Sequence, residues 1–335
     1  MKRNMKAWVS ELIACEKKSP IPVLSFPCVQ LLGISVKDLI SDSKLQAKGM
    51  KAVADRVPSG ASVSLMDLSV EAECFGSTIR VSEDEVPTVV GSIVNDPDEA
   101  EALPIPNVGA ARSGLYVKAI EEAVQLIQDR PVFAGVIGPF SLAGRLMDVS
   151  ETMINCYDEP EMVHTVMEKV TAFVIDYCRA YKEVGANGVM IAEPLAGLMS
   201  PALAREFAHP YVKRVIEAVQ DDNFAAIYHN CGDNVAVMAK DIYELGAAGY
   251  HFGDAIRLAD MLPNAPKDAL VMGNVSPSKE FRNGTPESIE EATRKVMQEC
   301  AEYPNFLISS GCDIPPMTPW ENIDAFFAAV KKVYH

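Results

Sequence analysis

The sequence predicts an α/β protein, a (β/α)8 TIM barrel with an N-terminal helical extension. Two observations lead to this prediction: eight short runs rich in Val, Ile and aromatic residues recur along the 335 residues, and longer amphipathic stretches separate them. The runs are apolar throughout, which suits parallel strands that are buried on both faces. An open doubly wound sheet with a helical subdomain is the alternative. No Gly-x-Gly-x-x-Gly motif follows any run, which disfavours the dinucleotide-binding form of that alternative.

The expected elements can be placed along the chain in order. The eight strands are 21–26, 62–66, 132–137, 188–192, 224–228, 249–252, 270–273 and 306–310. Proline next to a capping residue marks four helices, from 158 to about 184, from 200 to about 220, from 285 to about 302, and from 318 onward. Residues 1–20 form the extension, and the segments 27–55 and 68–115 are expected as added loops. A single barrel domain over 1–335 accounts for the whole chain.

The charge balance excludes several classes of partner. Lys and Arg total 30 against 46 Asp and Glu, which gives a formal net charge of -16. Such a chain lacks the basic surface expected for nucleic acid or for an anionic membrane. No run of 18 apolar residues occurs, and the first residues are charged rather than apolar, so we expect no membrane segment and a cytoplasmic location.

The cysteines divide into two groups. Eight cysteines are too sparse for a disulfide scaffold, and in a reducing compartment metal binding or catalysis becomes the role of interest. Six of them are expected to pack as small apolar side chains, and Cys156, Cys178 and Cys300 lie in helical patterns that suit this role. Cys231 and Cys312 differ, because each follows a predicted strand.

Polar residues of the acid and metal-ligand types follow the predicted strands. A barrel carries its chemistry at the carboxyl ends of its strands, where the βα loops begin. The residues found there are Asp67 after the second strand, Glu193 after the fourth, His229 and Cys231 after the fifth, Asp254 after the sixth, Asn274 after the seventh and Cys312 after the eighth. The sequence therefore predicts a functional site at this rim.

His229, Cys231 and Cys312 together fit a zinc site. An imidazole and a thiolate two residues apart can reach one ion, and barrel closure brings the later Cys312 to the same rim. Three protein ligands leave a fourth position for substrate, as catalytic zinc requires. Zinc would deprotonate a bound thiol near neutral pH, and thiolates attack methyl donors. The competing interpretation is that His229 caps a strand end and both cysteines pack in the barrel wall.

Several motifs, taken together, resemble the uroporphyrinogen decarboxylase superfamily. They begin at Pro139 (PFSLAG), Glu193 (EPLAGLMSP), His229 (HNCGD), Gly273 (GNVSP) and Ser310 (SGCDIPPMTPWEN), and they stand in order at the expected strand ends. The resemblance covers roughly 60–335 well and the first 60 residues poorly. It implies a (β/α)8 barrel with its site at the carboxyl rim.

The superfamily has two main branches, and the resemblance favours one of them. Its decarboxylases act on uroporphyrinogen without metal or cofactor. Its corrinoid-dependent methyltransferases carry His-x-Cys and a distant Cys as Zn²⁺ ligands, and His229, Cys231 and Cys312 match those positions. That branch implies a methylcobamide co-substrate carried by a corrinoid protein, since this chain lacks an Asp-x-His-x-x-Gly cobamide signature. The methyl acceptor is expected to be a small molecule, a thiol or similar nucleophile such as coenzyme M or tetrahydrofolate. We expect a monomer or a homodimer.

Departures from the decarboxylase pattern matter as well. The decarboxylases use an arginine-rich loop after the first strand to bind substrate carboxylates, but no arginine occurs here between positions 4 and 55. Asp67 does match the decarboxylase aspartate that holds the pyrrole NH groups. Decarboxylation of a tetrapyrrole carboxylate therefore remains an alternative. A non-catalytic barrel that binds a corrinoid or tetrapyrrole is a third possibility.

The remaining candidate residues have less defined roles. Asp254 would supply a fourth metal ligand if its loop shifts by one residue, because related zinc thiol-alkyl transferases carry a carboxylate near this point. Glu193, water or the incoming thiol are the alternatives, and Glu193 and Asp67 are the catalytic candidates. Asn274 and Ser310 are expected to orient neighbouring loops around the bound cofactor. The acidic stretch after position 66 could be a solvated helix face or the lining of the mouth.

Overall fold

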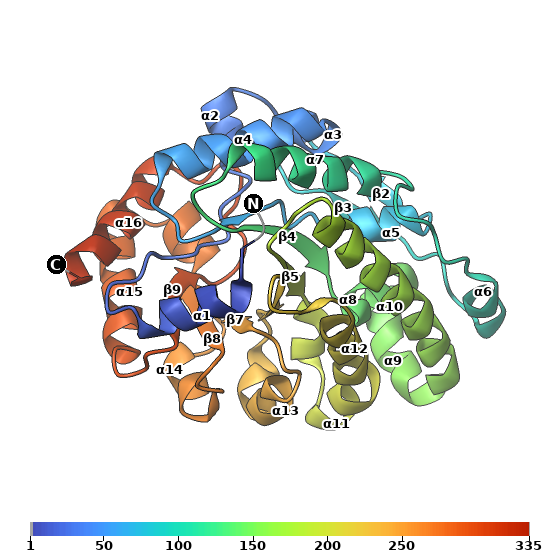
Figure 1. Ribbon diagram of the computed structural model, residues 1–335. Helices are drawn as coiled ribbons and strands as arrows, with labels where there is room; N and C mark the ends of the chain where they lie inside the picture. The colour runs from blue at the N-terminus through green and yellow to red at the C-terminus, as the bar shows by residue number, and fades with distance from the viewer. Residues whose placement is uncertain (1–2, 335) are drawn as a thin grey trace.

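A curled sheet of parallel strands forms the centre of the computed structural model, which describes residues 3–334. The strand order is β1-β4-β5-β6-β7-β8-β9, and helices surround the outer face of the sheet (Figure 1). The strands are β1 (Ser62–Val63), β4 (Val132–Ile137), β5 (Gly188–Ala192), β6 (Ala225–Asn230), β7 (Gly249–Phe252), β8 (Leu270–Val275) and β9 (Phe306–Ser310). A separate antiparallel pair joins β2 (Thr78–Arg80) to β3 (Thr88–Val90). The predicted α/β barrel is confirmed.

The first predicted strand, 21–26, is wrong as a regular strand. This segment is extended chain that lies between β9 and β1: the backbone N–H of Ile21 donates to the carbonyl of Ile308 in β9, and Gly60 just before β1 donates to Pro20. Alternate residues of a strand donate to opposite neighbours. Ile21 and Val23 donate toward β9, whereas Pro22 has no N–H to offer to β1. The eighth position of the barrel wall is therefore filled without a regular ladder.

Apolar side chains fill both faces of the sheet. Every residue of β4 to β9 is buried. Inside the barrel, Phe133, Met190, Ile227, Met272 and Leu307 belong to one apolar cluster contributed by successive strands. A larger cluster lies between the strands and the surrounding helices. The uniformly apolar runs of the sequence thus reflect burial on two sides.

Helix α1 (Met5–Ala14) closes one end of the barrel. Its Met5 and Val9 side chains join the interior cluster, and the backbone N–H groups of Met5 and Lys6 donate to the carbonyl of Asp222, shortly before β6 begins. The expected N-terminal helical extension is therefore present and covers the amino-terminal ends of the strands (Figure 1). The carboxyl ends of the strands, at the opposite end, remain available for function.

The outer layer contains the remaining helices. They are α2 (Cys28–Leu32), α3 (Val36–Ser41), α4 (Ser43–Arg56), α5 (Val70–Cys74), α6 (Pro97–Ala102), α7 (Ser113–Leu126), α8 (Pro139–Met147), α9 (Val149–Asp158), α10 (Pro160–Glu183), α11 (Pro201–Leu203), α12 (His209–Val219), α13 (Ala239–Tyr243), α14 (Leu258–Met261), α15 (Pro286–Glu299) and α16 (Trp320–Tyr334). Short 3-10 or π-helical turns occur between several of them.

The predicted helices are found, with two differences. Thr285 and Ser288 form a capping box at the start of α15, as the sequence indicates. The helix expected from 200 to 220 is divided, because a π-helical turn at Ala204–Ala208 separates α11 from α12. Both segments expected as loops contain regular structure. Ser35 and Asp42 cap α3 and α4 within 27–55. The segment 68–115 contains α5, α6 and the β2–β3 pair.

None of the helices within residues 3–334 combines the length and the apolarity that crossing a membrane requires. The longest, α10, has 24 residues, but it buries one face against the sheet and neighbouring helices and presents charged residues on the other.

Candidate metal centre

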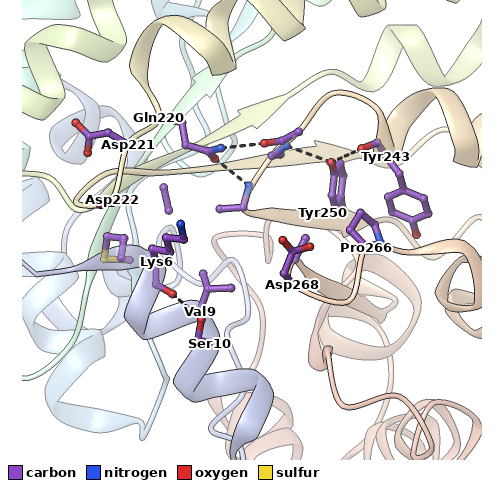
Figure 2. A pocket seen from close by; sticks show the side chains of 16 residues that line it. Lys6, Val9, Ser10, Gln220, Asp221, Asp222, Tyr243, Tyr250, Pro266 and Asp268 are labelled. Carbon is purple, nitrogen blue, oxygen red and sulfur yellow. Dashed lines mark hydrogen bonds between the residues drawn. The ribbon is translucent and has the colours of Figure 1, made fainter.

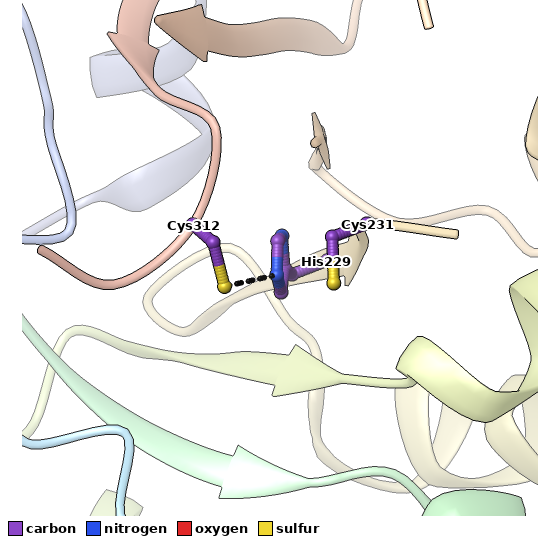
Figure 3. A group of neighbouring side chains, drawn as sticks. All are labelled: His229, Cys231 and Cys312. Atoms are coloured by element: carbon purple, nitrogen blue, oxygen red, sulfur yellow. Dashed lines mark hydrogen bonds between the residues drawn. The ribbon is translucent and has the colours of Figure 1, made fainter. Parts of the chain in front are cut away.

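Three side chains that could hold a metal ion converge at the carboxyl ends of β6 and β9. His229 is the penultimate residue of β6, Cys231 directly follows that strand, and Cys312 lies two residues beyond β9. One ligand atom from each lies within 4.8 Å of the other two. Figure 3 shows the three side chains pointing toward one another. His229 is buried, and both cysteines are half-buried.

The spacing of these atoms fits a tetrahedral zinc site. Zn–N bonds near 2.0–2.1 Å and a Zn–S bond near 2.3 Å, at a tetrahedral angle, place nitrogen and sulfur about 3.6 Å apart. The distance from His229 Nε2 to Cys312 Sγ is 3.4 Å. The donor set of one imidazole and two thiols is also one that zinc accepts. His229 and Cys312 could therefore bind one ion with little rearrangement, and Cys231 lies within reach of the same ion.

The loop that carries Cys231 is fixed by its neighbours. Asn230 uses its side-chain oxygen to accept the N–H of Gly232 at 2.9 Å, and its amide nitrogen donates to the Tyr228 hydroxyl at 2.9 Å. Gly253, after β7, approaches so closely that a Cβ placed there would lie 2.5 Å from the Cβ of Cys231. A larger residue than glycine at 253 would therefore displace the ligand loop.

The two cysteine thiols have opposite pKa shifts. A hydrogen bond from Cys312, followed by the influence of His229, lowers the pKa of Cys231 to about 4. The same hydrogen bond, together with burial, raises the pKa of Cys312 well above its usual range. The protonation states of the two thiols are thus linked, and a metal ion that binds both would have to displace their protons.

A second histidine, His251, contacts the ligand histidine. The two Nδ1 atoms of His229 and His251 lie 2.7 Å apart, and His251 Nε2 lies 2.8 Å from the Ser309 hydroxyl. His251 is fully buried, and burial lowers its pKa well below the usual value. His251 is not among the site residues predicted from the sequence. The signal that identifies it is the strand register of the structure, in which His229 of β6 pairs directly with His251 of β7.

Asp67 lies in a buried polar cluster after β1. Arg112 donates to its Oδ2 at 2.5 Å, Tyr116 donates to the same atom at 2.7 Å, and the hydroxyl of Ser69 donates to Oδ1 at 2.5 Å. Arg112 also bonds Glu73 at 2.6 Å. The acidic stretch is therefore not a solvated helix face, and both oxygens of Asp67 already have protein donors.

Glu193 is buried at the start of helix α8. Its two carboxylate oxygens accept the backbone N–H groups of Phe140 at 3.0 Å and Ser141 at 2.6 Å, which satisfies two of the free donors at that helix terminus. Burial raises the pKa of Glu193 to about 7, although the hydrogen bonds from Ser141 and Phe140 oppose this shift. In this arrangement its oxygens hold α8 against the loop that follows β5.

The other predicted site residues occupy different surroundings. The amide of Asn274 donates to the carbonyl of Gly253 at 2.9 Å, so it orients the loop that packs on Cys231. The hydroxyl of Ser310 accepts the N–H of Val23 at 3.0 Å and thereby holds the closing segment of the barrel. Asp254 is exposed and does not belong to the group of three ligand atoms.

Glu71 is a buried carboxyl near this rim. Its Oε1 accepts the N–H of Ile137 at 2.9 Å, while its Oε2 has no hydrogen-bond partner among residues 3–334. Burial raises its pKa from 4.5 to about 7, more than the nearby Arg145 lowers it. The native chain therefore keeps a proton here that the unfolded chain releases as the pH rises from 4.5 toward 7.

We expect the Glu71→Gln variant to gain stability relative to the wild type as the pH rises through this window. The neutral Glu71 carboxyl stabilises the wild type fully below the pKa that this group has in the unfolded chain. This contribution is lost as the pH rises through the pKa of the group in the folded protein, whereas glutamine stays neutral. At 1.36 kcal/mol per pKa unit, the difference reaches about 3 kcal/mol by pH 8. Urea unfolding of both proteins with a chelator present, from pH 4.5 to 8, measures it. Parallel profiles would contradict the assignment.

The opposite end of the barrel has a cavity of about 380 Å³ (Figure 2). Lys6 and Ser10 of α1, Asp222, Tyr250 and Asp268 line it. These residues lie near the amino-terminal ends of β6 to β8, whereas the three candidate ligands lie at the carboxyl ends. In barrels of this type, stability rather than chemistry is associated with this end.

Comparison with known proteins connects this geometry to a family. The family model described as "Uroporphyrinogen decarboxylase (URO-D)" matches residues 24–333. A methylcobamide:CoM methyltransferase, MtbA, from Methanosarcina acetivorans is 27% identical over 272 residues, which cover 79% of this chain and 77% of that protein. A uroporphyrinogen decarboxylase from Coxiella burnetii is also 27% identical, over 307 residues that cover 82% and 78% of the two chains.

Among solved structures, one described as a methyltransferase from Methanosarcina mazei superimposes on this chain with a TM-score of 0.87. The match covers 99% of both chains at 23% sequence identity. It establishes that the two proteins share a fold. Because the curated relatives include both methyltransferases and decarboxylases, the choice between these enzyme activities depends on the site residues.

Proposed function

The chain belongs to the uroporphyrinogen decarboxylase family, and from this premise we propose that it is a zinc-dependent methyltransferase. It moves a methyl group from a methylated corrinoid, carried by a partner protein, to a thiol acceptor. The observation that supports this most directly is the convergence of His229, Cys231 and Cys312 at the functional rim of the barrel. The names of similar proteins agree with it, since several are methylcobamide:CoM methyltransferases.

The proposed roles of the residues follow from their surroundings. Bound by His229, Cys231 and Cys312, zinc would leave one position open and lower the pKa of an acceptor thiol that occupies it. The chain would supply two thiolate sulfurs to the ion and one neutral nitrogen, from residues at the carboxyl ends of two strands. The half-buried cysteines leave the site open to a partner on one side, and the buried imidazole closes it on the other.

The acceptor is proposed as a small thiol because a zinc-bound thiol loses its proton near neutral pH and thiolates attack methyl donors. Coenzyme M is the thiol named for the relatives, and it is therefore the first compound to test. Tetrahydrofolate or another nucleophile remains a second choice. Asp254 and Glu193 are retained as candidates near the site, and Asp254 is exposed.

Decarboxylation is less well supported by the contacts. A carboxylate that binds pyrrole NH groups needs free oxygens, but both oxygens of Asp67 accept hydrogen bonds from Ser69, Arg112 and Tyr116. The loop after residue 26 also has no arginine to bind the carboxylates of a polyanionic tetrapyrrole.

The proposal is tested by anaerobic incubation of the zinc-loaded protein with methylcobalamin and a panel of acceptors. Coenzyme M, other thiols and tetrahydrofolate are supplied separately, and loss of the methyl–cobalt absorbance is followed. We expect demethylation that depends on both protein and a thiol, together with the methylated thiol as product. Full activity in a metal-free preparation would contradict the zinc role. Turnover of uroporphyrinogen with no reaction on any acceptor would favour decarboxylation.

A further inference from the structure

We propose that His251 is a positioning residue, which holds His229 in the tautomer whose Nε2 lone pair is free for the metal. This inference rests on the proposed metal site and adds a residue outside the ligand set. It follows from a chain of hydrogen bonds that crosses three strands and ends on a backbone carbonyl. The direction of each bond can be assigned from that end.

The backbone carbonyl at the far end of this series of hydrogen bonds determines which atom donates in each bond. Ser309 Oγ lies 2.7 Å from the carbonyl oxygen of Ile21, and a carbonyl oxygen only accepts, so the hydroxyl donates its one proton there. The contact of 2.8 Å between Ser309 Oγ and His251 Nε2 must then use a proton on the histidine. His251 is therefore protonated at Nε2.

The hydrogen bond between His251 and His229 then determines the tautomer of the ligand histidine. His251 is 0% exposed, and its ring nitrogens contact His229 and Ser309, neither of which is anionic, so burial favours the neutral ring. A neutral ring with its proton at Nε2 has a lone pair at Nδ1. The 2.7 Å contact between the two Nδ1 atoms then requires that His229 donates.

His229 is therefore in the tautomer that can bind a metal ion through Nε2. With its proton at Nδ1, His229 has a lone pair at Nε2, the atom 3.4 Å from Cys312 Sγ. The other nitrogen of a ligand histidine usually donates to a carboxylate, a backbone carbonyl or water. Here a neutral imidazole accepts instead, so the orientation is fixed without adding negative charge to a site that already has two thiols.

The three strands make this arrangement rigid. His229 and His251 are register partners in β6 and β7, and Ser309 lies in β9. The rings of the two histidines meet edge to face, with centroids 4.7 Å apart and planes inclined by 61°. Rotation of either ring would break at least one bond of the chain in a buried region, where lost hydrogen bonds are costly.

Three substitutions of His251 separate the contacts. Asparagine places its side-chain oxygen near the position of Nδ1, so His251→Asn keeps the acceptor for His229. Glutamine places its amide near Nε2, so His251→Gln keeps the Ser309 contact and loses that acceptor. His251→Phe loses both. We expect the Gln and Phe variants to bind zinc about 10–100-fold more weakly, and the Asn variant to bind close to wild type.

Zinc affinity is measured by competition with a chromophoric chelator, and the Co²⁺-substituted proteins are compared by their visible spectra. Thermal unfolding of the metal-free proteins separates folding defects from ligand defects. A matched control is His209→Phe, which replaces a second buried histidine on α12 and should leave zinc affinity unchanged. Equal zinc affinity in wild type, His251→Gln and His251→Phe would overturn the inference.

A second measurement needs no metal. Only five histidines occur, so ¹⁵N spectra of histidine-labelled, metal-free protein can report the tautomer of His229. We expect the proton at Nδ1 in the wild type and not in His251→Phe. A proton at Nε2 in the wild type would overturn the inference. If the wild type binds neither zinc nor cobalt, the proposed function fails, and the tautomer measurement still decides the role of His251.

Discussion

Replacing Cys312 by serine is expected to remove bound zinc and abolish methyl transfer to a thiol. The substitution deletes one of three ligands whose atoms lie within 4.8 Å, and a neutral hydroxyl does not replace a thiolate. The loss of affinity should exceed the roughly 100-fold that removal of an outer partner causes. Metal analysis after dialysis, together with loss of methylcobalamin absorbance, measures both effects.

A second ligand variant and a control variant complete this test. Cys231→Ser removes a ligand from the other strand and should have the same effect. Cys15→Ser removes an exposed cysteine that is more than 200 residues from the ligands in sequence. This variant should retain both zinc and activity. Retention of stoichiometric zinc by Cys312→Ser would show that this residue is not a ligand. A decarboxylase activity that survives the same substitution would favour the alternative function.

Replacing Arg112 by alanine is expected to destabilise the protein by about 3–5 kcal/mol. The side chain of Asp67 is 0% exposed and that of Arg112 is 15% exposed, so the substitution leaves a buried carboxylate without its cation. Tyr116 and Ser69 would still donate to Asp67, but neither carries a charge. Urea unfolding at pH 7 measures the change in the free energy of unfolding.

An exposed ion pair provides the matched control. Arg214 bonds both oxygens of the Glu168 carboxylate, and these two side chains are 46% and 56% exposed. Arg214→Ala should therefore cost only about 0–1 kcal/mol. If Arg112→Ala costs no more than this control, the carboxyl of Asp67 does not depend on its cation in the folded protein.

Most of the barrel could be predicted from local sequence, because strands buried on both faces give continuous apolar runs. The exception is instructive: residues 21–26 have the composition of a strand, but Pro22 removes the donor that a ladder with β1 needs. Within 27–55, α2 and α3 are too short for an amphipathic period to appear, whereas α4 has 14 residues and could have been predicted. The capping residues of α3 and α4, Ser35 and Asp42, were visible in the sequence.

The candidate ligands could be found from sequence because strand ends meet at one rim of a barrel. Their partners could not be found that way. The pairing of His229 with His251 requires the register of two strands, and strand limits alone do not determine register. The Arg112–Asp67 contact joins residues 45 positions apart across an irregular segment, which no periodic pattern reveals.

The hydrogen bond between Ser309 and Ile21 also has a consequence for the order of assembly. Its acceptor and donor are 288 residues apart. At about 5–20 residues per second, a ribosome that has made Ile21 needs on the order of 15–60 s to reach Ser309. During that time β6 can emerge with His229 and Cys231, while the residues that orient and complete the site do not yet exist. The proposed zinc site therefore lacks Cys312 until the last part of the chain has been made, so we expect tight zinc binding only after the barrel wall has closed.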